Sequence, residues 1–235
     1  MKPLLILFFF CAAPAKAQQQ TVDFKTKDGC RIEAYFMAPS SGAYVFVNTH
    51  GLGSGKGEWG PFQDALRARG HGYLSLDLRG HGGSLACGGK QTDYRKFSKA
   101  AWANASRDIT AAAAWLKKRG FPAKRTVLCG ASIGANLSVK AAAEGAAPAA
   151  LILLSAGLDY AGLKPERYFP AGTYSVLVVA AQDDPYAWNS AVPLHDAARA
   201  KKADVALMEG GSGHGVNMFK SPGVTDKILD WASGL

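Results

Sequence analysis

Beyond its first seventeen residues the chain has no apolar run that approaches the roughly 20 residues needed to cross a bilayer as a helix. It also lacks internal repeats, low-complexity tracts and linker-like segments. Charged residues make up only 19% of the sequence and apolar residues 48%, a balance typical of globular proteins and unlike that of disordered chains. At 235 residues the chain is short for two domains with separate cores, so one domain is expected.

Cysteine is scarce, and no cysteine and histidine spacing resembles a zinc site, so no metal is expected. Cys11 lies in the N-terminal segment, which leaves Cys30, Cys87 and Cys129. Cys129 falls inside an apolar strand-like run and is expected to be a buried small hydrophobe. Whether Cys30 and Cys87 pair cannot be deduced from the sequence.

The N-terminal segment, residues 1–17, has the pattern of a secretory signal peptide. A lysine precedes an apolar run, and the small-x-small end at Ala17 fits a signal-peptidase site. A retained anchor and a lipid-modified Cys11 are the alternatives, although Phe10 is bulky for a lipidation site. Residues 18–235 are then expected to form an exported domain, periplasmic or secreted, that does not associate with the membrane after cleavage.

The positive charge of the chain is dispersed. Loss of residues 1–17 removes two lysines and no acid, so the formal net charge falls from +9 to +7. The densest cationic clusters, at 117–119 and 201–202, stand where helices are expected to end, which suits the helix dipole. No basic motif interleaved with aromatic residues is present, so nucleic acid is not an expected partner.

The order of apolar segments indicates an α/β fold. Residues 22–26 and 31–37 read as strands around Asp28-Gly29, a pair suited to a tight hairpin turn. Near-continuous apolar strands then alternate with helix-length segments, which predicts a mostly parallel sheet covered by helices on both faces. The further strands are expected at 43–48, 72–77, 126–129, 149–154, 174–181 and 205–209.

Helices are expected at 58–69, 102–119, 133–144, 190–201 and 224–232, because most of these segments are amphipathic or alanine-rich at helical spacing. Residues 83–101 are expected to be irregular. The connection at 158–173 is short, which leaves little room there for a large cap domain.

The strongest chemical signal is GASIG at 130–134, which follows an apolar strand and precedes an alanine-rich helix. This is the nucleophile-elbow pattern in the strand-turn-helix context that it needs. Ser132 is the candidate nucleophile, and the glycines on either side leave space for a sharp turn. The N–H of Ile133, at the start of the helix, is a candidate oxyanion donor.

The partners of the serine are expected in the order acid and then histidine. Asp184, after the strand at 174–181, is the favoured acid, and Asp183 and Asp159 remain alternatives. His214, in a glycine-rich loop after the last strand, is the candidate general base.

The glycine-rich segment after the first parallel strand is expected to approach the substrate oxygen closely. Leu52 N–H is the candidate second oxyanion donor, and His50 is expected to support this loop. His71 and His195 are expected to be solvated.

The chain resembles the α/β-hydrolases from about Val22 to its C-terminus. Four landmarks carry the resemblance: His50-Gly51, DLRGHGGS at 77–84, the turn around Ser132, and the loops of Asp184 and His214. In that family the second landmark is structural, which implies a supporting role for His81. LLSAGLDY at 153–160 is similar to small bacterial esterases related to dienelactone hydrolases, although the cysteine nucleophile of true dienelactone hydrolases is absent.

The expected function is a serine hydrolase that cleaves small carboxylic esters through an acyl-enzyme, without a metal or cofactor. The same three residues could serve thioesters, amides or acyl transfer, and a binding protein without turnover is the alternative from another class. An open cleft for short acyl groups is expected, edged by Tyr160, Trp188 or Trp59. The sequence does not determine the oligomeric state.

Overall fold

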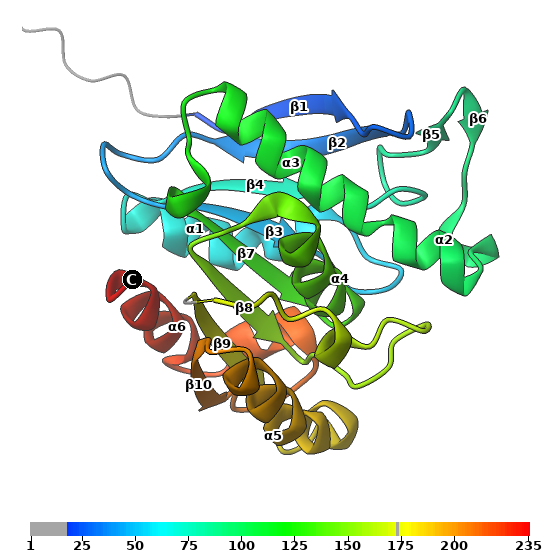
Figure 1. Ribbon diagram of the computed structural model, residues 1–235. Coiled ribbons are helices and arrows are strands. Elements are labelled where there is room, and N and C mark those ends of the chain that lie inside the picture. Colours follow the sequence, from blue (N-terminus) through cyan, green and yellow to red (C-terminus); the bar gives the residue numbers. More distant parts are fainter. Residues whose placement is uncertain (1–17, 173) are drawn as a thin grey trace, which may run out of the picture.

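The computed structural model describes residues 18–172 and 174–235, so the predicted signal peptide lies outside the described residues. Its centre is an eight-stranded sheet in the order β1-β2-β4-β3-β7-β8-β9-β10 (Figure 1). Strands β1 and β2 pair antiparallel, β2 also runs antiparallel to β4, and the other pairs are parallel. The strands of this sheet are β1 (Gln20–Lys25), β2 (Arg31–Met37), β3 (Val45–Thr49), β4 (Gly72–Leu76), β7 (Thr126–Ala131), β8 (Ala150–Leu154), β9 (Ser175–Ala180) and β10 (Asp204–Glu209).

The α-helices cover both faces of the sheet (Figure 1). Helices α2, α3, α4 and α5 contribute to one hydrophobic core, and α1 and α6 contribute to the other. Their bounds are α1 (Gly60–Ala68), α2 (Lys99–Asn104), α3 (Ser106–Lys118), α4 (Ile133–Ala141), α5 (Pro185–Ala200) and α6 (Val224–Ser233). The α/β-hydrolase fold class expected from the sequence is thereby confirmed, and no large cap interrupts the described residues.

Short 3₁₀ and π turns occupy the connections between these elements. The region expected to be irregular holds only a two-stranded ribbon and one 3₁₀ turn between Gly83 and the start of α2. The ribbon strands are β5 (Ala86–Cys87) and β6 (Lys90–Gln91), and the turns are η1 (Lys56–Trp59), η2 (Tyr94–Lys96), η3 (Ala123–Arg125), η4 (Ala142–Ala146), η5 (Pro165–Arg167) and η6 (Gly215–Lys220).

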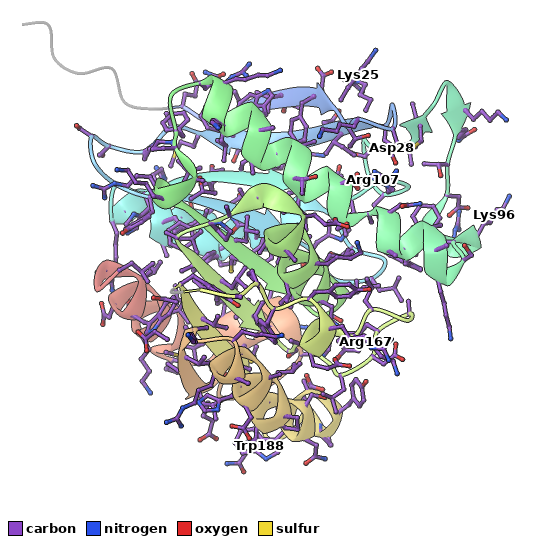
Figure 2. All side chains as sticks on the ribbon, viewed as in Figure 1. Lys25, Asp28, Lys96, Arg107, Arg167 and Trp188 are labelled. Carbon is purple, nitrogen blue, oxygen red and sulfur yellow. A yellow bond between two sulfur atoms is a disulfide. The ribbon has the colours of Figure 1, made fainter. Side chains whose placement is uncertain are left out.

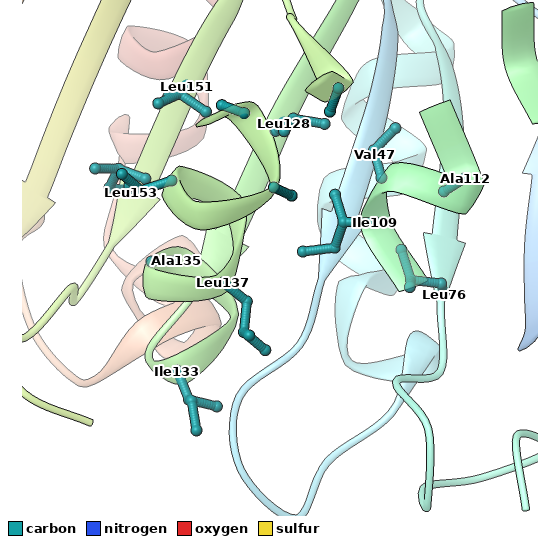
Figure 3. Close-up of a cluster of buried hydrophobic side chains, with 14 of the residues drawn as sticks. Val47, Leu76, Ile109, Ala112, Leu128, Ile133, Ala135, Leu137, Leu151 and Leu153 are labelled. Atoms are coloured by element: carbon teal, nitrogen blue, oxygen red, sulfur yellow. The ribbon is translucent and has the colours of Figure 1, made fainter. Parts of the chain in front are cut away.

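The central strands are apolar on both faces because both faces are covered. In β8, Leu151 and Leu153 enter the core beneath α3 and α4, whereas Ile152 and Leu154 enter the opposite core. Figure 3 shows Leu151, Leu153 and Leu128 among the side chains of the first core, with Ile109 of α3. Continuous apolar runs in the sequence therefore correspond to buried parallel strands.

Two helices differ from the sequence prediction. The segment expected as one helix is divided into α2 and α3 at Ala105, where the Ser106 hydroxyl donates to the Ala103 carbonyl at 3.0 Å. Such hydroxyl contacts compete with the helical hydrogen bonds. Helix α5 begins at Pro185, earlier than expected, because proline suits the first helical turn, where its missing N–H has no partner to lose.

Exposed cations occur on several parts of the surface. Lys25, Lys96 and Arg167 are exposed and occupy different parts of the surface in Figure 2. The described residues include no helix that is both long and apolar enough to cross a membrane.

Candidate active site

Ser132 occupies a sharp turn between β7 and α4. Its φ of 57° and ψ of −125° lie outside the regions that side-chain-bearing residues prefer, and its N–H donates to the Leu154 carbonyl at 2.8 Å. A side chain at Gly130 would collide with the start of α4, and one at Gly134 would collide with the Thr49 carbonyl. The two glycines thus permit the strained turn that presents the serine hydroxyl at the edge of the sheet.

The loop after β3, which we name the oxyanion loop (residues 50–58) for its proposed role, lies against this turn. A Cβ placed on Gly51 would stand 3.4 Å from the Cβ of Ser132. Leu52, the next residue, is 62% exposed. The N–H of Ile133 belongs to the first turn of α4 and has no partner within the helix. The two oxyanion donors predicted from the sequence therefore lie in different segments: Leu52 is in the loop after β3, and Ile133 begins the helix that follows Ser132.

Two buried histidines support the oxyanion loop. His50 accepts the Leu78 N–H at its Nε2, 2.9 Å away, and its Nδ1 lies 2.7 Å from the Gly51 carbonyl. His81 stacks on Tyr94 at 3.9 Å, and its Nε2 accepts the Gly53 N–H at 3.4 Å. Burial lowers the pKa of His50 to about 4 and also lowers the pKa of His81, so both rings are neutral near pH 7.

An ion-pair cluster fixes the end of the oxyanion loop. The Lys56 ammonium lies 2.9 Å from a Glu33 carboxylate oxygen and 2.6 Å from one of Asp77. The Asp77 carboxylate also accepts the backbone N–H groups of Lys56 and Gly83. Lys56 and Asp77 are largely buried, so their charges need compensation. The two carboxylates compensate the ammonium, and the ammonium and the two backbone N–H groups compensate Asp77.

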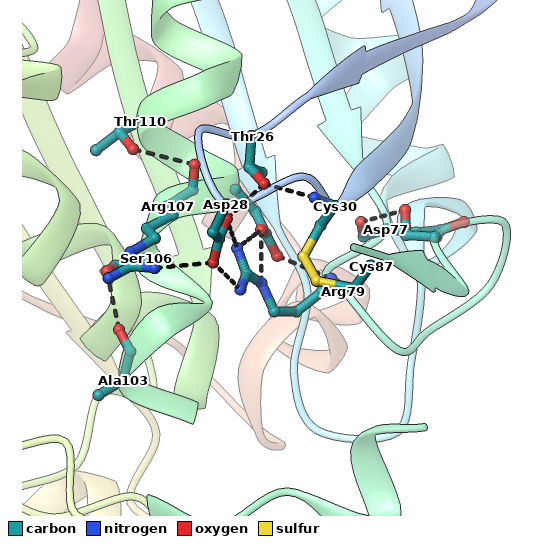
Figure 4. A network of polar contacts seen from close by, with 12 residues as sticks. Thr26, Asp28, Cys30, Asp77, Arg79, Cys87, Ala103, Ser106, Arg107 and Thr110 are labelled. Carbon is teal, nitrogen blue, oxygen red and sulfur yellow. Dashed lines mark hydrogen bonds and ion pairs between the residues drawn. A yellow bond between two sulfur atoms is a disulfide. The ribbon is translucent and has the colours of Figure 1, made fainter. Parts of the chain in front are cut away.

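A second polar network ties the β1–β2 hairpin to α3. Figure 4 shows Arg79 and Arg107 converging on Asp28, beside the disulfide between Cys30 and Cys87. Arg79 also donates to Asp108, which is fully buried. The disulfide left open by the sequence is thus present, and Cys129 is free and buried as expected.

His214 and Asp184, thirty residues apart in the sequence, are in direct contact. Nδ1 of His214 lies 2.6 Å from Oδ2 of Asp184. The Asp184 side chain is 12% exposed and stands at the start of α5, whereas the His214 side chain is 45% exposed. The carboxylate is placed to orient the ring and to stabilise its protonated form.

The other two candidate acids have different partners. Asp183 accepts the Ser212 hydroxyl and the Gly213 N–H, at 2.5 and 2.9 Å, and so caps the loop that carries His214. Asp159 accepts the Gly162 N–H at 2.7 Å within its own turn. Of the three acids weighed from the sequence, the structure brings only Asp184 to the His214 ring.

Ser155 holds the segment that carries His214, which we name the histidine loop (residues 210–214), beside the nucleophile turn. The hydroxyl of Ser155 accepts the Gly215 N–H at 2.8 Å. A Cβ on Gly215 would stand 3.3 Å from the Cβ of Ala131. The residue after His214 therefore packs directly against the residue before Ser132.

Sequence reasoning missed two contributors to the site, Ser155 and Glu58, and gave Tyr160 only as a possible edge of the cleft. Glu58 accepts the Gly51 N–H at 3.1 Å, and burial raises its pKa although that amide and Ser54 oppose the rise. A hollow of about 580 Å³ beside the histidine loop is lined by Glu58, Pro61, Val216, Asn217, Phe219 and Lys220.

Two expectations about other residues were wrong. His71 is buried and its Nδ1 accepts the Tyr44 N–H at 3.3 Å, so it is not a solvated histidine. Trp59 is fully buried in the core and does not edge the cleft. Among the residues that the structure describes, no group of three or more potential metal ligands gathers.

The order of the strands and the helices on both faces of the sheet are those of an α/β-hydrolase. A sequence model described as "Serine aminopeptidase, S33" matches residues 41–168, more than half of the chain. The chain belongs to this family of α/β-hydrolases. No curated protein matches the sequence.

Solved structures support the same fold. The esterase Pf2001 of Pyrococcus furiosus aligns with a TM-score of 0.73 at 12% identity, over 99% of this chain and 96% of that one. The dienelactone hydrolase of Anabaena variabilis aligns at 0.67 and 16% identity, over 94% and 97%. Est1E of Butyrivibrio proteoclasticus, solved with ferulic acid bound, aligns at 0.65 and 19% identity, over 88% and 97%. At such identities the likeness concerns the fold.

Proposed function

We propose that the protein is a serine hydrolase that cleaves small carboxylic esters through an acyl-enzyme. The observation that carries the proposal is the 2.6 Å contact between His214 and Asp184 on loops that pack beside the strained turn of Ser132. The strain at Ser132 supports a functional role, because strained backbone conformations cost free energy and cluster at functional sites. Esterases among the structural relatives are consistent with this chemistry.

In the proposed cycle, Ser132 Oγ attacks the ester carbonyl carbon while Nε2 of His214 takes the serine proton. The N–H groups of Leu52 and Ile133 donate to the oxygen that becomes negative. His214 returns the proton to the alcohol as the bond to carbon breaks, and water then hydrolyses the acyl-enzyme by the same steps. Throughout the cycle, the Asp184 carboxylate accepts a hydrogen bond from the Nδ1–H of His214.

A fluorophosphonate probe tests the nucleophile directly, because it phosphonylates an activated serine. We expect labelling of the wild-type protein and none of Ser132→Ala, whereas Ser41→Ala, a change at an exposed serine in a loop, should label normally. Absence of labelling in the wild-type protein would favour a binding protein that retains the fold. Equal labelling of Ser132→Ala would place the reactive residue elsewhere.

A panel of p-nitrophenyl esters of increasing acyl length tests the substrate range. Among its described residues the connection between β8 and β9 carries only the 3₁₀ turn η5 and no cap helices, so we expect short acyl chains to be hydrolysed best. A clear preference for long chains would contradict an open cleft. Parallel assays with thioesters and amides of the same acyl group would separate esterase activity from the other reactions open to these residues.

We also propose that the protein is exported after cleavage behind Ala17. The disulfide between Cys30 and Cys87 supports this proposal, since such bonds persist mainly in oxidising compartments. Mass spectrometry of the protein recovered outside the cytoplasm should show a chain that begins at Gln18. A chain that retains Met1 would contradict cleavage.

A further inference from the structure

The hydroxyl of Tyr160 lies at the end of β8, beside the turn that carries Ser132, and has no part in the cycle above. It donates to the carbonyl of Ser155 at 3.3 Å, and the preceding carbonyl, that of Leu154, accepts the N–H of Ser132 at 2.8 Å. Two neighbouring carbonyls at the end of β8 thus hold the serine backbone and the phenol. The Tyr160 ring is also perpendicular to the ring of His214, with centroids 6.4 Å apart.

The phenol remains a hydrogen-bond donor at any pH at which the enzyme would work. Burial, together with the negative charge of Asp184, raises the pKa of Tyr160 to about 12, although hydrogen bonding with the Ser132 side chain opposes the rise. The hydroxyl of Tyr160 therefore keeps its proton beside the serine.

The loop that carries Tyr160 is fixed from two sides. Asn136, one turn beyond Ser132 in α4, is buried, and its side-chain amide donates to the carbonyls of Gly157 and Leu163 at 2.8 and 2.9 Å. Tyr186 donates to the Asp159 carbonyl and packs edge-on against Tyr160. A Cβ on Gly157 would stand 2.7 Å from the Tyr160 ring, so the ring has little freedom to move.

The sheet order determines which side of the serine this hydroxyl occupies. Strand β7, which carries Ser132, lies between β3 and β8. The oxyanion loop follows β3 on one side, whereas the Tyr160 loop follows β8 on the other, with Asp184 after β9 and His214 after β10 beyond it. The oxygen that leaves with the alcohol must lie on the histidine side, because His214 protonates it.

We propose that the Tyr160 hydroxyl turns from the Ser155 carbonyl to donate its hydrogen bond to the departing alcohol oxygen, and that the substrates are esters of aliphatic alcohols. The inference rests on the proposed function. In this step the bond between the carbonyl carbon and the alcohol oxygen breaks, the electron pair stays on that oxygen, and His214 supplies the proton. Tyr160 keeps its own proton and stabilises the negative charge that develops before the transfer is complete. Aliphatic alkoxides are strongly basic and need this help, whereas p-nitrophenolate leaves without it.

The test compares Tyr160→Phe with the wild-type enzyme on two esters of one acid, ethyl butyrate and p-nitrophenyl butyrate. The kcat/KM is measured because it includes only the steps up to alcohol release. For Tyr160→Phe we expect a loss of about 10- to 100-fold on the ethyl ester, the range for one hydrogen bond to a charged oxygen. On the p-nitrophenyl ester we expect a loss of less than about threefold, since little charge requires stabilisation.

Tyr73→Phe is the matched control, because it removes a phenol hydroxyl at the amino end of β4, which donates to Gln19 and lies outside the site. It should change kcat/KM for both esters by the same factor. The inference would be overturned if Tyr160→Phe lost activity equally on both esters, or lost none on either. In that case, fluorophosphonate labelling of the variant would still support the proposed function. A wild-type protein that hydrolyses neither ester and takes no label would instead end both proposals.

Discussion

The two sides of the site are held in different ways. The oxyanion loop is supported by buried side chains, with His50 fully buried and Lys56 paired with Asp77. The histidine loop is held through its backbone on either side of His214, by Asp183 at Gly213 and by Ser155 at Gly215, and His214 is half exposed. Burial makes one imidazole a neutral support, whereas exposure beside a carboxylate suits the other to carry protons. The environment, and not the residue type, separates these roles.

The largest effect should come from the acid on the histidine side. Asp184→Asn removes the carboxylate that orients His214, and we expect kcat/KM for a p-nitrophenyl ester to fall by about 10⁴-fold. Asp183→Asn, the adjacent control, keeps an oxygen acceptor for the Gly213 N–H and should cost less than about tenfold. If the two variants exchanged these effects, the contact between Asp184 and His214 would not be the functional pair.

The next effect should come from the disulfide on the oxyanion side. It closes a loop of 57 residues and joins the β1–β2 hairpin to the ribbon that precedes Tyr94, the residue stacked on His81. Replacement of Cys30 and Cys87 together by alanine should lower the free energy of unfolding by about 4 kcal/mol. Urea denaturation of the variant and of the reduced wild-type protein measures this. A loss below about 1 kcal/mol in both would show that the oxyanion side does not depend on the bridge.

Acid should weaken the oxyanion side through His50. Its pKa is lowered to about 4 in the folded protein from 6.5, so between these values the unfolded chain binds a proton that the folded one does not. The free energy of unfolding should therefore fall by about 3 kcal/mol as the pH drops from 6.5 to 4.

Urea denaturation across this pH range checks the expectation, with His195→Gln as the control, because His195 lies on α5 beside Asp196 and away from this loop. The control should keep the wild-type slope. A flat profile in the wild-type protein would mean that His50 is protonated in the folded state.

The smallest effect should come from Ser155. Ser155→Ala leaves the Gly215 N–H without its acceptor in a buried position and should lower the free energy of unfolding by about 1 to 3 kcal/mol. Ser155→Gly loses the same hydroxyl but is better suited to the local φ of 51°, so it should be less destabilised than the alanine variant. Thermal unfolding of both variants compares them, and equal stability would show that the backbone conformation of Ser155 stores no strain.

The architecture of the protein could be predicted because it is encoded locally. Apolar runs such as Leu151–Leu154 report a strand buried on both faces, and the glycines around Ser132 report a turn that excludes side chains. The order of serine, acid and histidine then follows the order of the strands. These signals were sufficient for the fold class and for the candidate residues that the structure brings together.

The supporting contacts could not be predicted, because they join segments far apart in the sequence. Nothing beside Tyr160 indicates that its hydroxyl reaches the end of β8, and Ser155 meets Gly215 across sixty residues. His71 was misjudged because its polar neighbours in the sequence are not its neighbours in the core. The helix expected at 190–201 begins earlier, at Pro185, because proline favours the first turn of a helix.

The position of Cys129 has a consequence for how the chain matures. In an extended polypeptide any two of the cysteines among the described residues could react, and two of the three combinations would be wrong. Cys129 lies on a central strand and is sealed from solvent once the sheet forms, and burial raises the pKa of its thiol well above the usual value. When the chain folds before its thiols are oxidised, only Cys30 and Cys87 of these three remain available to form a disulfide. Refolding under reducing conditions, followed by oxidation in air, should therefore yield a single disulfide-bonded product.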